Sequence, residues 1–79
     1  MNQSEIQEKL FPIFKEVFEK EIGITPELTA SDVANWDSLT HMVLITTLEE
    51  RFGVKFTLRD LNKMKNVGVL MQIIEKKLN

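Results

Sequence analysis

The stretch Asn35-Trp36-Asp37-Ser38-Leu39 places a serine at the start of a predicted helix, directly after a long segment without helical periodicity. Asp37 is a favourable N-cap, because its carboxylate can accept hydrogen bonds from amide N–H groups that the first turn leaves unpaired. Ser38 then occupies the first helical position with a free hydroxyl, where the helix dipole favours an attached negative charge. The position suits a covalently attached phosphate group, although serines also start many ordinary helices.

The helix that follows is predicted to run from Asp37 or Ser38 to about Phe52, with Gly53 closing it. A stripe of residues has close to the spacing of one helical face and predicts the side that meets the core. It comprises Leu39, Met42, Val43, Ile45, Thr46, Leu48 and Phe52.

An amphipathic helix is predicted near the N-terminus, where Ser4 and Gln7 have the spacing of a capping box. Pro12 cannot donate to the helical ladder, so we expect a kink or a break near residues 10 and 11. Gly23 is predicted to end the helix as a left-handed cap. The predicted buried face consists of Ile6, Leu10, Ile13, Phe14, Val17 and Phe18.

Residues 24–37 form a predicted long loop, which Leu28 and Val33 are expected to hold against the core.

After the second helix, residues 54–57 are predicted to be an extended connector, because no partner strand exists elsewhere in the chain. Thr57 is expected to cap a short helix over 58–62, and Asn66 to cap the last helix. That helix has a predicted buried face of Val67, Leu70, Met71, Ile74 and Leu78. The prediction is an all-α four-helix bundle, a single domain over residues 1–79 with a short third helix.

Composition limits the possible functions of these 79 residues. The formal charge of −2 argues against binding to nucleic acid, and the lack of Cys together with a single His argues against a structural metal site. The sequence contains no apolar run of membrane-spanning length, and its first residues lack signal-peptide features, so we expect a cytoplasmic protein without a membrane partner. A chain this small cannot enclose a sizeable substrate pocket, which favours a carrier or adaptor over an enzyme.

A Ser-His-Asp catalyst is an alternative, because Asp37, Ser38 and His41 fall within five positions. Ser38 and His41 can be neighbours on one helical face. A triad also needs the acid to orient the imidazole and an oxyanion hole, whereas Asp37 is better placed as a cap. Hydrolysis is therefore not the favoured interpretation.

The whole pattern resembles the acyl carrier protein family, small four-helix domains that carry a 4′-phosphopantetheine arm. The resemblance depends on Trp36-Asp37-Ser38-Leu39, on Leu48-Glu49-Glu50-Arg51-Phe52-Gly53-Val54, on Phe56, and on Asn66-Val67 opening the last helix. These features extend in the family's order across roughly residues 5 to 78.

The resemblance implies that Ser38 is the covalent attachment point for phosphopantetheine, with Asp37 as its cap and positioning residue. A phosphopantetheinyl transferase would load the arm, an acyl-loading ligase or acyltransferase would charge its thiol, and downstream synthase enzymes would use the thioester. The protein would be a carrier rather than an enzyme, and we expect a monomer.

Two departures from the family pattern indicate which kind of partner the chain contacts. Asn35 stands where fatty-acid carriers have Gly, and beyond Ser38 the second helix has no acidic residue before Glu49. We therefore expect a more apolar partner contact and a specialised fatty-acid, polyketide or related pathway. The residues expected to contact partners are Trp36, His41, Met42, Val43, Glu49 and Glu50. Trp36 could equally anchor the long loop. An aminoacyl or peptidyl carrier, and a helical interaction module without a prosthetic group, are the alternatives.

Overall fold

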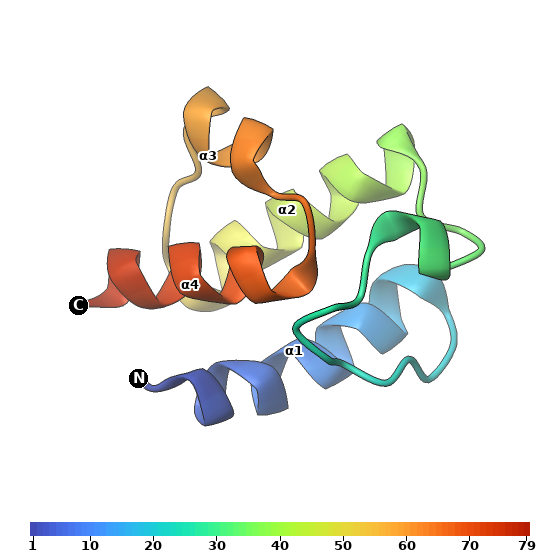
Figure 1. Cartoon of the computed structure of the whole chain (residues 1–79), viewed down its shortest axis with the longest axis horizontal. Helices are drawn as coiled ribbons and strands as arrows, with labels where there is room; N and C mark the ends of the chain where they lie inside the picture. The colour runs from blue at the N-terminus through green and yellow to red at the C-terminus, as the bar shows by residue number, and fades with distance from the viewer.

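The computed structural model describes residues 1–79 and contains four α-helices. They are α1 (Gln3–Phe18), α2 (Ser38–Phe52), α3 (Leu58–Lys63) and α4 (Val67–Leu78), with a 3₁₀ turn, η1 (Ala30–Asp32), in the loop between α1 and α2. The two chain ends lie near each other at one end of the molecule, and the start of α2 lies at the opposite end (Figure 1). The predicted all-α four-helix bundle with a short third helix is confirmed.

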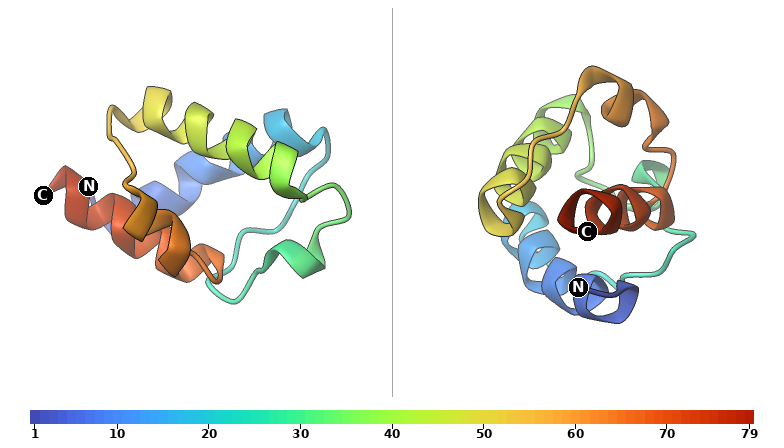
Figure 2. Two further views of the ribbon diagram at one scale, coloured as in Figure 1. Left: turned by 90° about the horizontal axis from the view of Figure 1, so that it is seen from above. Right: turned by 90° about the vertical axis from the view of Figure 1, so that its left-hand side faces the viewer.

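The core is entirely apolar and is built mainly between α1 and its neighbours α2 and α4. Seventeen residues are buried and none of them is polar or charged. Helix α3 is short, contributes no fully buried residue, and lies over the side where α2 and α4 face each other (Figure 2). Burial of the α1 face against two long helices is therefore the main source of the bundle's stability.

Helix α1 begins earlier than the sequence pattern predicts. Asn2 is its N-cap, and Asn2 and Glu5 form the capping box, so the assignment of that box to Ser4 and Gln7 was wrong. Gln7 instead uses its side-chain amide to donate to the carbonyl oxygen of Ile24, 2.6 Å away, and so holds the loop. Of the kink or break predicted near residues 10 and 11, the break is wrong, because α1 is continuous through the exposed Pro12.

The end of α1 lies at Phe18 rather than at Gly23. Glu19 adopts the left-handed conformation at φ 58°, and it is the only non-glycine residue with a positive φ. The earlier exit allows Ile22 and Ile24 to bury their side chains under the loop. Burial of these two isoleucines offsets a left-handed backbone that costs a residue with a Cβ atom roughly 1–2 kcal/mol.

Helix α2 has a narrower buried face than the predicted stripe. Ile45, Leu48 and Phe52 are buried as predicted, and Leu44 is fully buried with them. The other members of the stripe are exposed, namely Leu39, Met42, Val43 and Thr46. The predicted stripe therefore combines a core face with a second apolar face that meets solvent.

The long loop between α1 and α2 is tied to the start of α4. The N–H of Val67 donates to the carbonyl of Leu28, and the N–H of Gly68 donates to the carbonyl of Pro26, both at 2.9 Å. Val33 is buried and Leu28 packs against the core, as predicted. The loop uses N–H groups of the first turn of α4, which have no acceptor inside that helix.

Gly68→Ala should destabilise the protein by roughly 1–3 kcal/mol. A Cβ atom at this position would lie 3.0 Å from both the Cβ and the carbonyl oxygen of Pro26, so the loop would have to move away from α4. Chemical denaturation of the variant measures the loss. Gly23→Ala is the matched control, because a Cβ atom there meets nothing within 4 Å. Equal losses in the two variants would contradict the close approach of loop and helix.

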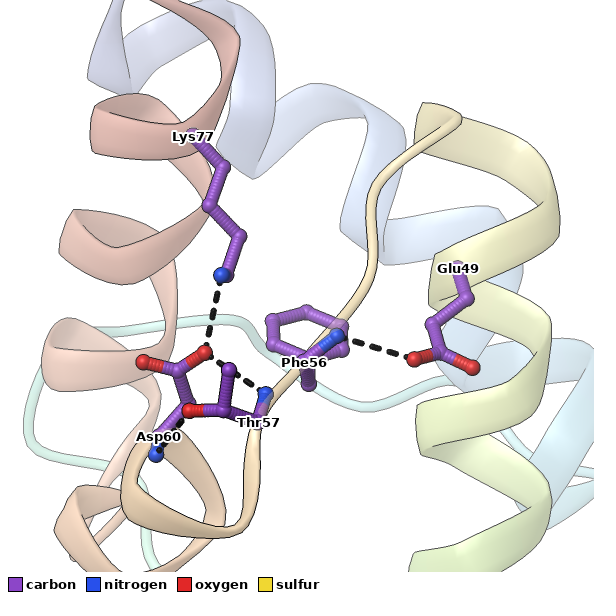
Figure 3. Close-up of polar contacts among 5 residues, drawn as sticks. All are labelled: Glu49, Phe56, Thr57, Asp60 and Lys77. Carbon is purple, nitrogen blue, oxygen red and sulfur yellow. Dashed lines mark hydrogen bonds and ion pairs between the residues drawn. The ribbon is translucent and has the colours of Figure 1, made fainter.

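The connector after α2 is extended, as predicted, and its residues Val54 and Phe56 are buried and half-buried. Its end is fixed by polar contacts, because Glu49 of α2 accepts a hydrogen bond from the Phe56 N–H at 2.9 Å (Figure 3). Thr57 caps α3 in a capping box with Asp60, and Lys77 of α4 lies 2.8 Å from the Asp60 carboxylate. These contacts hold α3 between α2 and α4.

Acid should weaken this attachment of α3 between about pH 4 and pH 2. The hydrogen bond from Lys77, and then that from the Thr57 N–H, lower the pKa of Asp60 from 3.8 to about 2. Because the folded pKa lies below the unfolded value, the stabilisation is complete above about pH 4 and is lost as the pH falls toward 2. Asp60→Asn should cost about 1 kcal/mol or less at neutral pH, since both partners retain contact with water.

Thermal unfolding of wild type and Asp60→Asn across this range measures the effect. The stability difference between the two proteins should shrink as the pH falls. A difference that stays constant down to pH 2 would contradict the assignment.

Candidate functional site

The first turn of α2 is organised by a capping box. Asp37 accepts a hydrogen bond on its carboxylate from the Thr40 N–H at 2.9 Å, and its own N–H donates to the Thr40 hydroxyl oxygen at 2.8 Å. The Thr40 hydroxyl also donates to the Asn35 carbonyl at 2.6 Å. The hydrogen bond from the Thr40 N–H is the largest cause of the lowered pKa of Asp37, so this carboxylate stays ionised at neutral pH. The predicted cap is confirmed.

Ser38 is the first residue of α2 and is exposed. The capping hydrogen bonds are made by Asp37 and Thr40, which leaves the Ser38 hydroxyl free. The positive end of the helix dipole lies at this turn. An accessible alcohol is thereby held on a rigid helix start, at the end of the molecule away from both termini (Figure 1).

Trp36 is half-buried and joins the loop to α1. Its ring lies 5.5 Å from that of Phe14 and 5.3 Å from that of Phe18, measured between centroids. Its indole N–H donates to Nδ1 of His41 at 3.0 Å, and the two ring planes lie within 21° of each other with centroids 6.0 Å apart. Of the two possibilities for Trp36, the structure supports the loop anchor. Burial lowers the pKa of His41, which favours the neutral imidazole.

The same contacts bear on the hydrolase alternative. The carboxylate of Asp37 is engaged with Thr40, and Nδ1 of His41 accepts from Trp36. A triad requires that carboxylate to orient the imidazole through one of its ring nitrogens. The three residues are therefore neighbours in space without being arranged as a triad.

A second apolar surface follows Ser38 along α2. Leu39 is 75% exposed, Met42 51% and Val43 48%, and these side chains line a shallow groove with Thr46, Thr47 and Glu50. Sequence reasoning placed Leu39 in the core, whereas its exposure makes it part of this surface. Glu49, another expected contact residue, is half-buried and accepts from the Phe56 N–H.

A small hollow of about 60 Å³ lies beside the Trp36–His41 pair. The loop turn η1 contributes Ala30, and the segment leading into α4 contributes Met64 and Lys65. Asn66 and Leu70 complete the lining. The hollow is thus enclosed by the loop, by α2 and by the start of α4.

The structure contains neither a metal-binding cluster of side chains nor a membrane-spanning helix. No group of three or more His, Cys, Asp or Glu side chains lies close enough together to hold a metal ion. None of the four helices combines the length and the apolar character needed to cross a lipid bilayer.

Comparisons with known proteins agree with this geometry. The family model for the phosphopantetheine attachment site matches residues 8–74. An acyl carrier protein of Thermosynechococcus vestitus is 35% identical over 79 residues, covering 99% of this chain and 98% of the relative. One from Thermotoga maritima is 34% identical over 77 residues, covering 91% and 95%.

A solved structure shows the same fold. The solution NMR structure of a holo acyl carrier protein from Geobacter metallireducens superposes with a TM-score of 0.87 at 46% identity. The match covers 91% of this chain and 84% of that chain. The family model, the relatives and the shared bundle lead to one conclusion: the chain belongs to the acyl carrier protein family and contains a phosphopantetheine attachment domain.

Proposed function

We propose that Ser38 holds the phosphopantetheine arm and that the chain delivers acyl groups, bound as thioesters, to separate enzymes. The observation that carries this proposal is the exposed Ser38 hydroxyl at the first position of α2. The arm supplies a thiol that forms the thioester, and the chain has no Cys that could replace it.

The surroundings of Ser38 fit such a group. The hydroxyl is accessible to a modifying enzyme, and the helix start stabilises the negative charge of a phosphodiester. The other two serines lie elsewhere, Ser4 in α1 and Ser31 in η1. A 3₁₀ turn of three residues has neither the aligned dipole nor the free amide groups of α2, which favours Ser38 over Ser31. Ser4 lies outside residues 8–74, which the phosphopantetheine family model matches.

Arm transfer follows from ordinary phosphoryl chemistry. The Ser38 hydroxyl oxygen forms a bond to the phosphorus of the pantetheine-bearing phosphate of coenzyme A, and the pyrophosphate bond breaks. Adenosine bisphosphate leaves, and the hydroxyl proton passes to a base on the transferase. Asp37 contributes by fixing the turn that presents Ser38, through its two hydrogen bonds with Thr40.

Acyl carrier proteins are carriers and not catalysts, and their partners are transferases and synthases. For this chain we propose a phosphopantetheinyl transferase, a loading ligase or acyltransferase, and downstream synthase enzymes. The site has an ionised cap and a neutral, half-buried imidazole, both already engaged in internal hydrogen bonds. Neither group is therefore free to act as a catalytic base in an unbound carrier.

The proposed docking surface is the exposed face of α2 that follows Ser38. Leu39, Met42 and Val43 make it apolar, and Glu50 supplies an acidic residue at its far end. Trp36, His41 and Glu49 are engaged within the chain, so their proposed role at the interface is secondary. Apolar contacts next to the arm suit partners with a complementary apolar patch rather than a strongly basic one.

Met42→Glu should lower kcat/KM for arm transfer about tenfold, the effect of losing a good apolar contact at an interface. Phe11→Glu is the matched control, because Phe11 is a similarly exposed apolar residue on α1. Initial rates of loading by a purified transferase measure both variants. Equal losses would contradict the assignment of the docking surface to α2.

The cargo is proposed to be an acyl group of a specialised fatty-acid, polyketide or related pathway, because α2 lacks acidic residues before Glu49. An aminoacyl or peptidyl carrier is the second candidate and would differ in its loading enzyme. The genes beside the one for this chain distinguish the two, since an amino-acid-adenylating enzyme or a ketosynthase identifies the cargo class.

Intact mass spectrometry tests the attachment. The purified apo chain is incubated with coenzyme A, Mg²⁺ and a transferase of broad specificity, and omission of the transferase is the control. The expected result is a gain of one phosphopantetheine per chain, only with the transferase. A chain that gains no mass while a known carrier is fully loaded in the same mixture would favour the interaction-module alternative.

A further inference from the structure

The only Trp and the only His of the chain form a hydrogen bond that fixes the state of the imidazole. Trp36 has only an N–H donor, and it donates to Nδ1 of His41 at 3.0 Å. Nδ1 must therefore be the acceptor nitrogen, and a neutral imidazole must have its proton on Nε2. The indole ring of Trp36 packs against the rings of Phe14 and Phe18, and this packing restricts movement of its N–H group.

The Nε2–H group of His41 is left as a free donor. The one hydrogen bond of this side chain is made through Nδ1. The chain contains no buried polar side-chain atom without a partner, so Nε2 remains accessible from outside the protein. His41 lines the hollow of about 60 Å³, where most neighbours are apolar and Lys65 is the one other group that can be charged. Burial opposes protonation of the imidazole.

His41 is also placed next to the arm site. It follows Ser38 by three positions on α2, so the two side chains share one helical face. Helical side chains lean toward the N-terminus, which directs the imidazole to the turn that contains Ser38. The hollow beside it leads from α2 toward Met64 and Leu70. An arm that leaves Ser38 along this side passes the imidazole.

We propose that His41 is a positioning residue for the arm: Trp36 fixes its tautomer, and its Nε2–H donates a hydrogen bond to an amide carbonyl of phosphopantetheine. This inference rests on the proposed attachment at Ser38. An amide carbonyl is favoured over the phosphodiester because the imidazole is neutral and the hollow is mostly apolar.

Nuclear magnetic resonance of the ¹⁵N-labelled apo and loaded protein tests the proposal, with loading verified by intact mass. A chain with one His and one Trp gives one imidazole and one indole signal set, so assignment is unambiguous. In both forms the imidazole should be the Nε2–H tautomer. Loading should slow exchange of the Nε2 proton with water roughly two- to tenfold, the range of one net hydrogen bond, and should give cross-relaxation between the imidazole and the arm.

Trp36→Phe is the matched variant, because it keeps an aromatic ring and removes the N–H that fixes the tautomer. In the loaded variant the protection of Nε2–H and the contact with the arm should both decrease. Wild type that loads fully but shows neither effect overturns this inference and leaves attachment at Ser38 intact. A rise in the pKa of His41 on loading also overturns the inference. Such a rise would show that the imidazole donates to the charged phosphodiester and not to an amide carbonyl. A chain that never loads overturns the proposed function together with the inference.

Discussion

Ser38→Ala should abolish phosphopantetheine attachment while leaving the fold intact. The substitution removes the one nucleophilic oxygen proposed to accept the arm. The capping box of Asp37 and Thr40 does not use the Ser38 side chain, so α2 should start at the same residue. An exposed substitution of this kind changes the free energy of unfolding by about 0.5 kcal/mol or less. Intact mass after incubation with transferase measures attachment, and thermal unfolding measures the fold.

Ser31→Ala is the matched control for this variant. Ser31 is also exposed, but it lies in η1 rather than at the start of α2. It should load at the wild-type rate. Loading of Ser38→Ala to the wild-type extent would refute the attachment site, and unfolding of that variant would refute the account of the cap.

Leu48→Ala should cost roughly 2–5 kcal/mol of stability. Leu48 is 0% exposed and lies on the face of α2 that meets the core, so truncation leaves a cavity that the packed neighbours fill only partly. A domain of this size has a total stability of about 5–15 kcal/mol, and its melting temperature falls by about 4–8 °C per kcal/mol. The variant should therefore melt at least about 8 °C below wild type.

Leu39→Ala removes the same atoms from the same helix at a position that is 75% exposed, and it should change the melting temperature little. Equal melting temperatures for Leu48→Ala and wild type would show that the buried face of α2 is assigned wrongly. A large loss in Leu39→Ala would show that the second apolar face is structural and not a docking surface.

Features of the fold that depend on near neighbours could be predicted from the sequence. The caps at Asp37, Thr57 and Asn66 are each set by a side chain that accepts from an N–H three residues later. Gly53 closes α2 at φ 66°, as its sequence position indicates. Such contacts need no knowledge of the rest of the chain.

Features that depend on distant contacts could not be predicted. Glu19 adopts the left-handed conformation, and the chain that follows it buries Ile22 and Ile24 in the core. Local sequence rules favour Gly23 over Glu19 as the left-handed residue that ends the helix. Gly68 is required by the approach of Pro26, a residue far away in sequence. Within the α2 stripe, Leu39 could not be assigned to the surface from the sequence, because an apolar docking face and an apolar core face have the same composition.

The candidate site shows the same division. The sequence alone identifies Asp37 as the cap and Ser38 as the first helical residue, because both follow from local rules. The hydrogen bond between Trp36 and His41 crosses from the loop to the helix, where helical spacing rules do not apply. The five-residue separation of a Trp and a His around a helix start is the signal that could have suggested it.

The attachment position can be read directly by fragmenting the loaded protein in a mass spectrometer and locating the added mass along the chain. Every loaded molecule should have the arm on the fragment ions that contain Ser38, with Ser4 and Ser31 unmodified. An arm located on either of those two serines would show that Ser38 is not the attachment site.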